Sequence, residues 1–315
     1  MQRAPIRDDN PGDLVIIDAH QHVWDLTKAE YSWLGPEVPL WNRTFEFAEL
    51  RPQLKAAGVS ATVLVQSADN AEDTALMRAV ADEFAEVAAI VAYAPLGDAA
   101  AAATALDALA DDRRIVGVRN LIHTLPDPDW ILRPEVDEGL SVLEQRGLTF
   151  DYVSVLPRHL EHVPVLATRH PDLKIVIDHL SSPPFGTDRE PWWSLIAAAA
   201  EHPLVHAKVS GLYPGADSEN WSSASLRPYL DHALHIFGPG RLMYGGDWPI
   251  SIASGGYQHV FEELSEALAD LDQAAAEAIW SGTAAAFYGI DPARLEAATQ
   301  AWSDLDATND QEATR

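Results

Sequence analysis

The chain has 315 residues, of which 47% are apolar and 22% charged, and its formal net charge at pH 7 is −27. This length suits two average domains or one (β/α)₈ barrel, and the composition is typical of a soluble protein with a large core. The acidic excess argues against a nucleic-acid partner, because phosphate binding requires clustered Lys and Arg. Cysteine is absent, so any metal ion must be bound by His, Asp or Glu.

Residues 1–13 form a polar extension of mixed charge that lacks the apolar stretch of a signal peptide. No run of about 18 apolar residues follows, so we expect no membrane-spanning segment. These features predict a cytoplasmic protein without a membrane partner.

Short β-branched runs alternate along the chain with longer segments rich in Ala, Leu and Glu. The predicted strands are Leu14–Ala19, Ala61–Gln66, Ala88–Ala94, Ile115–Arg119, Leu148–Val153, Leu173–His179, Leu204–Ser210 and Arg241–Asp247. Predicted helices between them include Phe47–Ala57, Ala71–Phe84, Ala99–Ala110, Pro134–Arg146 and Pro157–His170. Near-continuous apolar runs are typical of parallel strands buried on both faces. Eight of them separated by helices predict an α/β protein with a single (β/α)₈ TIM barrel over residues 14–290.

A doubly wound open sheet is the alternative architecture, but it usually has fewer strands and a glycine-rich phosphate turn after the first. Here the first strand is followed by His20, Gln21 and His22. The long connection Val23–Thr44 is rich in Trp, which predicts a packed lid rather than a disordered loop. Residues 291–315 are predicted to form a polar C-terminal tail, and we expect its end, ATNDQEATR, to be frayed. No linker divides the chain into two domains.

Four polar side chains stand at predicted strand ends. His20 and His22 end the first strand, and period-2 geometry points both toward the lumen at its C-terminal mouth. His179 ends the sixth strand and Asp247 the eighth. Barrel enzymes place their active sites at this mouth, and three imidazoles with one carboxylate leave an open position for water, as in a catalytic metal site.

Several longer motifs accompany these four residues across most of the chain. They are Ile16–Asp25, Val63–Ser67, Gly117–Trp130, His170–Pro184, Lys208–Leu212, Arg241–Pro249 and Gly282–Ile290. Together they resemble the amidohydrolase superfamily, specifically the amidohydrolase-2 branch that contains sugar-lactone and 2-pyrone-4,6-dicarboxylate lactonases. The resemblance runs from about Leu14 to Ile290.

By this resemblance His20, His22, His179 and Asp247 match the family's catalytic quartet and its metal ligands. The last-strand aspartate of amidohydrolases takes a proton from the attacking water and returns it to the leaving group. The resemblance implies one divalent ion, Zn²⁺ or Mn²⁺, with metal-independent catalysis as the alternative. Relatives tend to carry Gly-Lys where this chain has Ser181 and Ser182. The absence of this lysine argues against transferring sugar-lactone specificity directly to this chain.

Further polar and aromatic residues fall at or near strand ends. Arg119 could clamp a carboxylate or hydroxyl with its planar guanidinium, or form an ion pair with a nearby acid. The other substrate-contact candidates are Gln66, Asp151, Lys208, Trp24, Trp33 and Trp248. Lys208 could instead pair with a buried acid such as Asp151, and the tryptophans could be core or lid packing. Among the remaining histidines, only His123 is a candidate for the site.

The predicted function is hydrolysis of a lactone or similar cyclic ester of a small polyhydroxylated or carboxylated molecule, with Asp247 as general base and acid. One alternative is metal-dependent, non-oxidative decarboxylation of an aromatic acid. Another is a non-catalytic barrel that binds a sugar acid. A small molecule is therefore the expected partner, and the sequence leaves open whether the chain forms a homo-oligomer.

Overall fold

The computed structural model describes residues 15–213 and 221–313, so the extension predicted at 1–13 lies outside the described residues. Eight parallel strands form one sheet in the order β1 to β8. They are β1 (Ile16–Gln21), β2 (Val59–Val65), β3 (Val87–Ala92), β4 (Ile115–Arg119), β5 (Thr149–Tyr152), β6 (Ile175–Ile177), β7 (Val205–Val209) and β8 (Leu242–Tyr244). The predicted (β/α)₈ barrel is confirmed.

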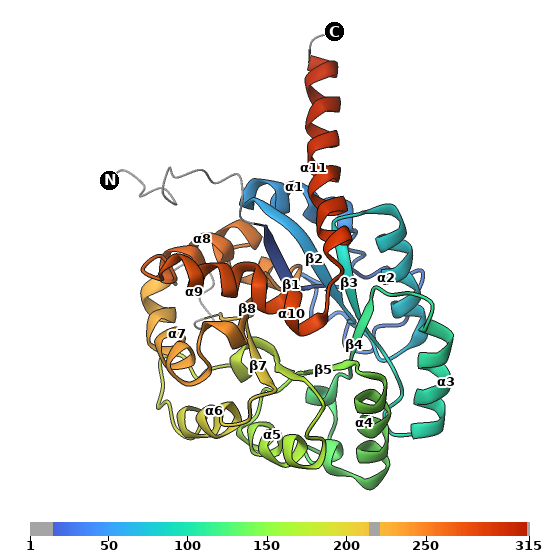
Figure 1. Ribbon diagram of the computed structural model, residues 1–315, viewed down its shortest axis with the longest axis vertical. Helices are drawn as coiled ribbons and strands as arrows, with labels where there is room; N and C mark the ends of the chain where they lie inside the picture. Colours follow the sequence, from blue (N-terminus) through green and yellow to red (C-terminus); the bar gives the residue numbers. More distant parts are fainter. Residues whose placement is uncertain (1–14, 214–220, 314–315) are drawn as a thin grey trace.

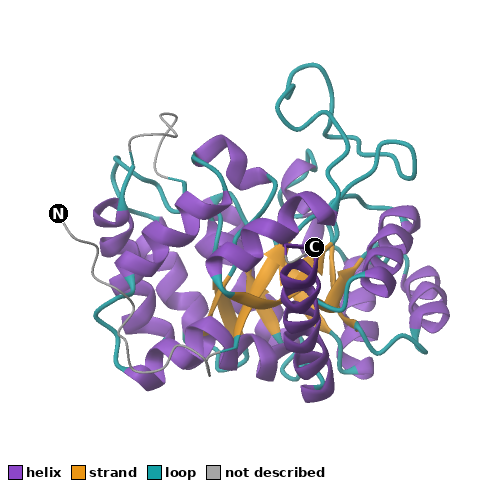
Figure 2. Ribbon diagram, turned by 90° about the horizontal axis from the view of Figure 1, so that it is seen from above, coloured by secondary structure: helices purple, strands orange, loops and turns teal. Residues whose placement is uncertain are grey.

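Helices follow the strands and surround them, as Figures 1 and 2 show. They are α1 (Phe47–Ala57), α2 (Ala71–Glu83), α3 (Ala99–Leu109), α4 (Pro134–Arg146), α5 (Pro157–Arg169), α6 (Trp192–Ala200), α7 (Ser223–Phe237), α8 (Tyr257–Ala267), α9 (Gln273–Glu277), α10 (Thr283–Tyr288) and α11 (Pro292–Ala313). Local signals set several ends: Pro134 and Pro157 occupy first helical positions, and Gly58 and Gly147 end α1 and α4 in the left-handed conformation.

The ends of β1 and β8 meet and close the barrel at its C-terminal mouth. The backbone N–H of His22 donates to the carbonyl of Trp248 at 2.8 Å, and that of Asp247 donates to the carbonyl of His20 at 2.8 Å. Closure of the sheet therefore brings the first-strand and last-strand motifs together.

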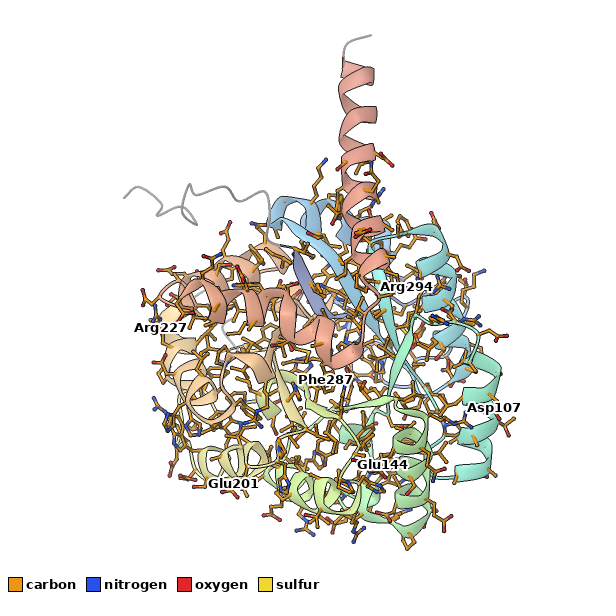
Figure 3. All side chains as sticks on the ribbon, in the orientation of Figure 1. Asp107, Glu144, Glu201, Arg227, Phe287 and Arg294 are labelled. Atoms are coloured by element: carbon orange, nitrogen blue, oxygen red, sulfur yellow. The ribbon has the colours of Figure 1, made fainter. Side chains whose placement is uncertain are left out.

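The hydrophobic core has two layers. A large cluster lies between the strands and the helices, and a smaller one fills the lumen around Val63, Val176 and Met243. Phe287 and Ala298, from α10 and α11, belong to the lumen cluster. Charged side chains such as Asp107, Glu201 and Arg227 project from the outer helices (Figure 3). No helix within the described residues is both long and apolar enough to cross a membrane.

The connection after β1 is packed by its aromatic side chains, as expected for a lid. The indole N–H of Trp24 donates to Arg43 at 2.6 Å, that of Trp33 to Ser67 at 2.8 Å and that of Trp41 to Pro249 at 3.2 Å, each to a backbone carbonyl. The first bond lies within the connection, and the other two tie it to the loops after β2 and β8.

The segment after Gly289, predicted as a polar tail, is helical. It forms α11, which projects from the barrel (Figure 1). Ala298 is fully buried, and the Trp302 indole donates to the carbonyl of Ser60 at 3.0 Å. Leu295, Ala298 and Trp302 share one face of the helix at a spacing of three and four residues, and this face is what packs against the barrel.

Candidate active site

His20 and His22 converge at the end of β1. Their Nε2 atoms lie 3.1 Å apart. The Nδ1 of His22 lies 2.7 Å from the carbonyl oxygen of Val65, which can only accept. Nδ1–H of His22 therefore donates to this carbonyl, which points its Nε2 into the site.

His179 reaches the site from a left-handed turn rather than from the strand end. β6 stops at Ile177, and the four residues 179–182 all have positive φ, between 48° and 58°. Such a run is costly for residues with a Cβ and is retained only where the surroundings enforce it. Gly211 is part of that surrounding: a Cβ there would lie 2.4 Å from Nδ1 of His179. The same Nδ1 lies 2.8 Å from the Ser210 hydroxyl, which fixes the ring orientation.

Asp247 likewise lies beyond the end of its strand, β8, which stops at Tyr244, and it has a positive φ of 51°. Gly245 and Gly246 allow this path, because a Cβ on the first would lie 2.7 Å from Cβ of His20 and a Cβ on the second 2.2 Å from the Tyr257 ring. The Tyr213 hydroxyl donates to Oδ2 of Asp247 at 2.9 Å.

The electrostatics favour an ionised Asp247 beside neutral rings of His20 and His179. Burial opposes its ionisation, but His179, His22 and His20 together hold the pKa of Asp247 well below its usual range. Burial lowers the pKa values of His20 and His179, and the charge of Lys208 lowers that of His20 further. A charged carboxylate with neutral imidazoles is the protonation state that binds a divalent cation.

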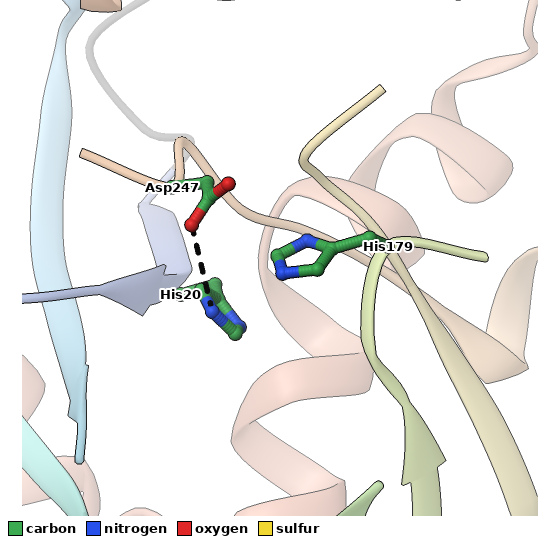
Figure 4. Close-up of side chains that lie close together, drawn as sticks. All are labelled: His20, His179 and Asp247. Atoms are coloured by element: carbon green, nitrogen blue, oxygen red, sulfur yellow. Dashed lines mark ion pairs between the residues drawn. The ribbon is translucent and has the colours of Figure 1, made fainter. Parts of the chain in front are cut away.

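His20, His179 and Asp247 each offer one ligand atom, and these atoms lie within 4.8 Å of one another (Figure 4). Oδ1 of Asp247 lies 3.7 Å from Nε2 of His20 and 3.5 Å from Nε2 of His22. Two ligand atoms of a tetrahedral zinc ion lie about 3.3 Å apart for metal–ligand bonds of about 2.0–2.1 Å. The donor types therefore suit a divalent metal ion, and the distances from Asp247 to His20 and His22 are close to the tetrahedral value.

Below these residues lies a buried network of charges. Asp178 accepts from Arg119 at 3.2 Å, its other oxygen lies 3.1 Å from Nζ of Lys208, and that oxygen also lies 3.3 Å from Nδ1 of His20. Nδ1 of His20 also lies 3.0 Å from Nζ of Lys208, and its Nε2 lies 3.1 Å from Nη1 of Arg119, so this network fixes the orientation of the His20 ring. Lys208 lies 2.5 Å from Asp151, which also accepts from the Tyr288 hydroxyl at 2.8 Å.

A cavity of about 280 Å³ opens beside Asp247 and His179. The predicted contact residues Trp24, Trp33 and Arg119 line it, with Trp24 and Trp33 packed edge to face at 5.1 Å. His123 and Ser182 also line this cavity. His123 is the additional histidine that the sequence offered for the site, and Ser182 is one of the two serines that stand where relatives tend to carry Gly-Lys.

Four other predicted contact residues occupy different positions. Asp151 and Lys208 are fully buried partners of each other, the arrangement considered as the alternative for Lys208. Gln66 is buried and donates to the carbonyl of Arg119 at 2.9 Å, and Trp248 packs on Phe45 at 5.5 Å. In the part of the chain that the structure describes, none of the four is among the residues lining this cavity, so substrate contact by them is not supported.

Two residues of the site were missed in the sequence. Asp178 immediately precedes His179 and was passed over, although an acid in an otherwise apolar strand end is a usable signal. Tyr213 follows β7 by four residues, and no local pattern places its hydroxyl on Asp247.

The sequence model of the amidohydrolase family matches residues 17–290. This chain belongs to the amidohydrolase family. The L-fucono-1,5-lactonase of Burkholderia ambifaria is 35% identical over 280 residues, which cover 87% of this chain and 96% of that protein. The L-fucono-1,5-lactonase of Burkholderia multivorans is 32% identical over 291 residues, with the same coverage of 87% and 96%.

Solved structures agree with this assignment. The crystal structure of an amidohydrolase from Burkholderia multivorans with bound zinc is 27% identical to this amidohydrolase and superimposes with a TM-score of 0.80. The match covers 88% of this chain and all of that chain. The resemblance to the amidohydrolase-2 branch is thereby confirmed.

Proposed function

We propose that this amidohydrolase hydrolyses a lactone of a small polyhydroxylated or carboxylated molecule, with Asp247 as general base and then general acid. The observation that carries the proposal is the convergence of His20, His179 and Asp247 beside a cavity that Arg119 also lines. The two L-fucono-1,5-lactonases among the relatives support a sugar lactone as substrate.

The reaction requires one proton to move twice. Water attacks the lactone carbonyl while Asp247 takes its proton; the C–O ring bond then breaks, and Asp247 returns the proton to the ring oxygen. The lactone and the water molecule are thereby converted into one hydroxy acid, and Asp247 is again ionised. A divalent ion held by His20, His179 and Asp247 would lower the pKa of water and polarise the carbonyl.

The protein's own side chains supply the remaining functions. Tyr213 holds one carboxylate oxygen of Asp247, which orients the other toward the imidazoles. Burial and the nearby Asp247 raise the pKa of Tyr213, so it remains a donor. Arg119 is placed to bind a substrate oxygen, and the part-exposed Trp33 offers a surface for a sugar ring, supported from behind by the buried Trp24.

A substrate panel tests the reaction class. We expect acid release, followed with a pH indicator, from L-fucono-1,5-lactone or related sugar lactones. Carbon dioxide release from hydroxylated benzoates, without acid release from any lactone, would favour decarboxylation instead. Tight binding of sugar acids with no turnover of any lactone would favour a binding barrel.

The Asp247→Asn variant tests the role of the carboxylate. The amide keeps the size but cannot accept the proton from water, so turnover should fall by about 10²-fold or more with substrate binding nearly unchanged. Asp151→Asn is the matched control, because Asp151 is buried away from the cavity and should alter stability more than turnover. Elemental analysis of both variants separates proton transfer from loss of a metal ligand. Wild-type turnover in Asp247→Asn would refute the assignment.

A further inference from the structure

A second cavity of about 280 Å³ lies over the C-terminal ends of β2, β3 and β4. Its walls include Asp69 after β2, the connection Tyr93–Asp98 after β3, Asn120 after β4, and Trp130. It lies on the same face of the barrel as the candidate active site, the face on which barrel enzymes bind ligands. Small-molecule pockets usually have volumes of about 300 Å³ or more, and this cavity is slightly smaller, so it suits a molecule with a single ring.

One short segment separates the two cavities. Arg119, Leu121 and His123 line the active-site cavity, whereas Asn120 and Leu125 line the second one. The backbone N–H of Leu121 donates to Asp69 at 3.0 Å, which holds the segment in place. The second cavity is therefore a separate space whose wall is shared with the active site.

The polar groups of the second cavity are mostly acceptors. Asn120 is 5% exposed, and its amide nitrogen donates to the carbonyl of Ala94 at 3.1 Å. Its Oδ1 atom is itself buried, so Asn120 shapes the wall rather than binding a ligand. The exposed carboxylates of Asp69 and Asp98 are the acceptors that a ligand in the cavity can reach, and they suit a ligand that donates hydrogen bonds.

The charges of the lining narrow the ligand class. Within the described residues the lining contains two carboxylates, Asp69 and Asp98, and no Lys, Arg or His, which disfavours an anion. Both carboxylates already accept from backbone N–H groups, Asp69 from Leu121 and Asp98 from Ala101, each at 3.0 Å. A cation is therefore not required to balance them.

We infer that this second cavity binds a neutral, donor-rich ring, namely an uncharged monosaccharide. Its hydroxyl groups would donate to Asp69 and Asp98, and the Trp130 and Tyr93 rings would pack on its C–H faces. The active-site cavity has the opposite character, because Arg119, His123 and His179 suit a substrate that becomes a carboxylate.

A blocking variant tests this site. Gly97 has an ordinary φ, and a Cβ there would meet only the Trp130 ring, at 3.8 Å, so Gly97→Leu should fill the cavity without backbone strain. The matched control is Gly240→Leu, since Gly240 also has an ordinary φ and no atom within 4 Å of its Cβ position. Arg119→Ala serves as the active-site control.

Calorimetric titration and saturation-transfer NMR with L-fucose, D-galactose and D-arabinose provide the readout, so turnover is not involved. We expect at least one of these sugars to bind the wild type and the Gly240→Leu and Arg119→Ala variants alike, and Gly97→Leu to weaken its binding at least tenfold. Absence of binding by all three sugars, or equal binding to Gly97→Leu, would overturn the inference. Stronger Gly97-dependent binding of choline or L-fuconate would also overturn it, by indicating a cation or an anion site.

Discussion

Arg119 contacts the buried charge network on one side and the active-site cavity on the other. Its Nη1 atom lies 3.2 Å from Asp178 and 3.1 Å from Nε2 of His20, while its buried Nε has no partner among the described residues. A guanidinium held on one edge can direct its remaining N–H groups at a substrate oxygen. Both sequence readings of Arg119, as clamp and as ion-pair partner, are thus compatible with its position.

The Arg119→Ala variant should therefore act mainly on substrate binding. Hydrogen bonds to charged groups contribute about 1.5–3 kcal/mol, so the Michaelis constant should rise by about 10- to 100-fold with a smaller change in kcat. Arg119→Lys should give an intermediate value, because it keeps the charge and loses the planar fork. Arg227→Ala, on the outer surface and paired with Asp270, is the control and should behave as wild type in steady-state kinetics. A fall in kcat with an unchanged Michaelis constant would contradict the binding role.

The elements that present the site were predictable to different degrees. Continuous apolar runs identified all eight strands, and the positions at or just after their ends predicted that His20, His22, His179 and Asp247 lie close together. The left-handed path through residues 179–182 could not be predicted, because none of them is glycine and the path depends on distant packing. One such contact is the hydrogen bond from the Trp192 indole to the carbonyl of Leu180 at 2.7 Å.

Gly211 offers a sharp test of how the elements position His179. In Gly211→Ala the new Cβ would have to displace the His179 ring, and a shift of about 1 Å in a catalytic group can cost about 10²-fold in rate. Gly147→Ala is matched, with φ of +66° and no atom within 4 Å of the Cβ position. Gly147→Ala should lower stability by about 1–2 kcal/mol and leave kcat unchanged. Equal kcat in the two variants, measured well below their melting temperatures, would show that His179 does not depend on Gly211.

At the scale of the whole molecule, the active-site residues lie at one end of the barrel, and the C-terminal helices that stabilise it pack at the other end. The active site stands at the C-terminal ends of the strands, while α10 and the first part of α11 join the lumen cluster through Phe287 and Ala298. The division into extension, barrel and tail remains a prediction. The polarity of the last residues concealed the apolar spacing of Leu295, Ala298 and Trp302, which is the signal for a docked helix.

Two truncations separate these roles. A chain ending at Ala307 keeps Trp302, its hydrogen bond to Ser60 and its contact with the Arg51 guanidinium, 5.4 Å from the ring centre. We expect its kcat, Michaelis constant and melting temperature to match the wild type. A chain ending at Asp291 loses the apolar face of α11, so its melting temperature should fall by roughly 5–10 °C while kcat of the folded protein is retained. Loss of turnover in the shorter deletion, with an unchanged melting temperature, would instead give the end of α11 a part in the reaction.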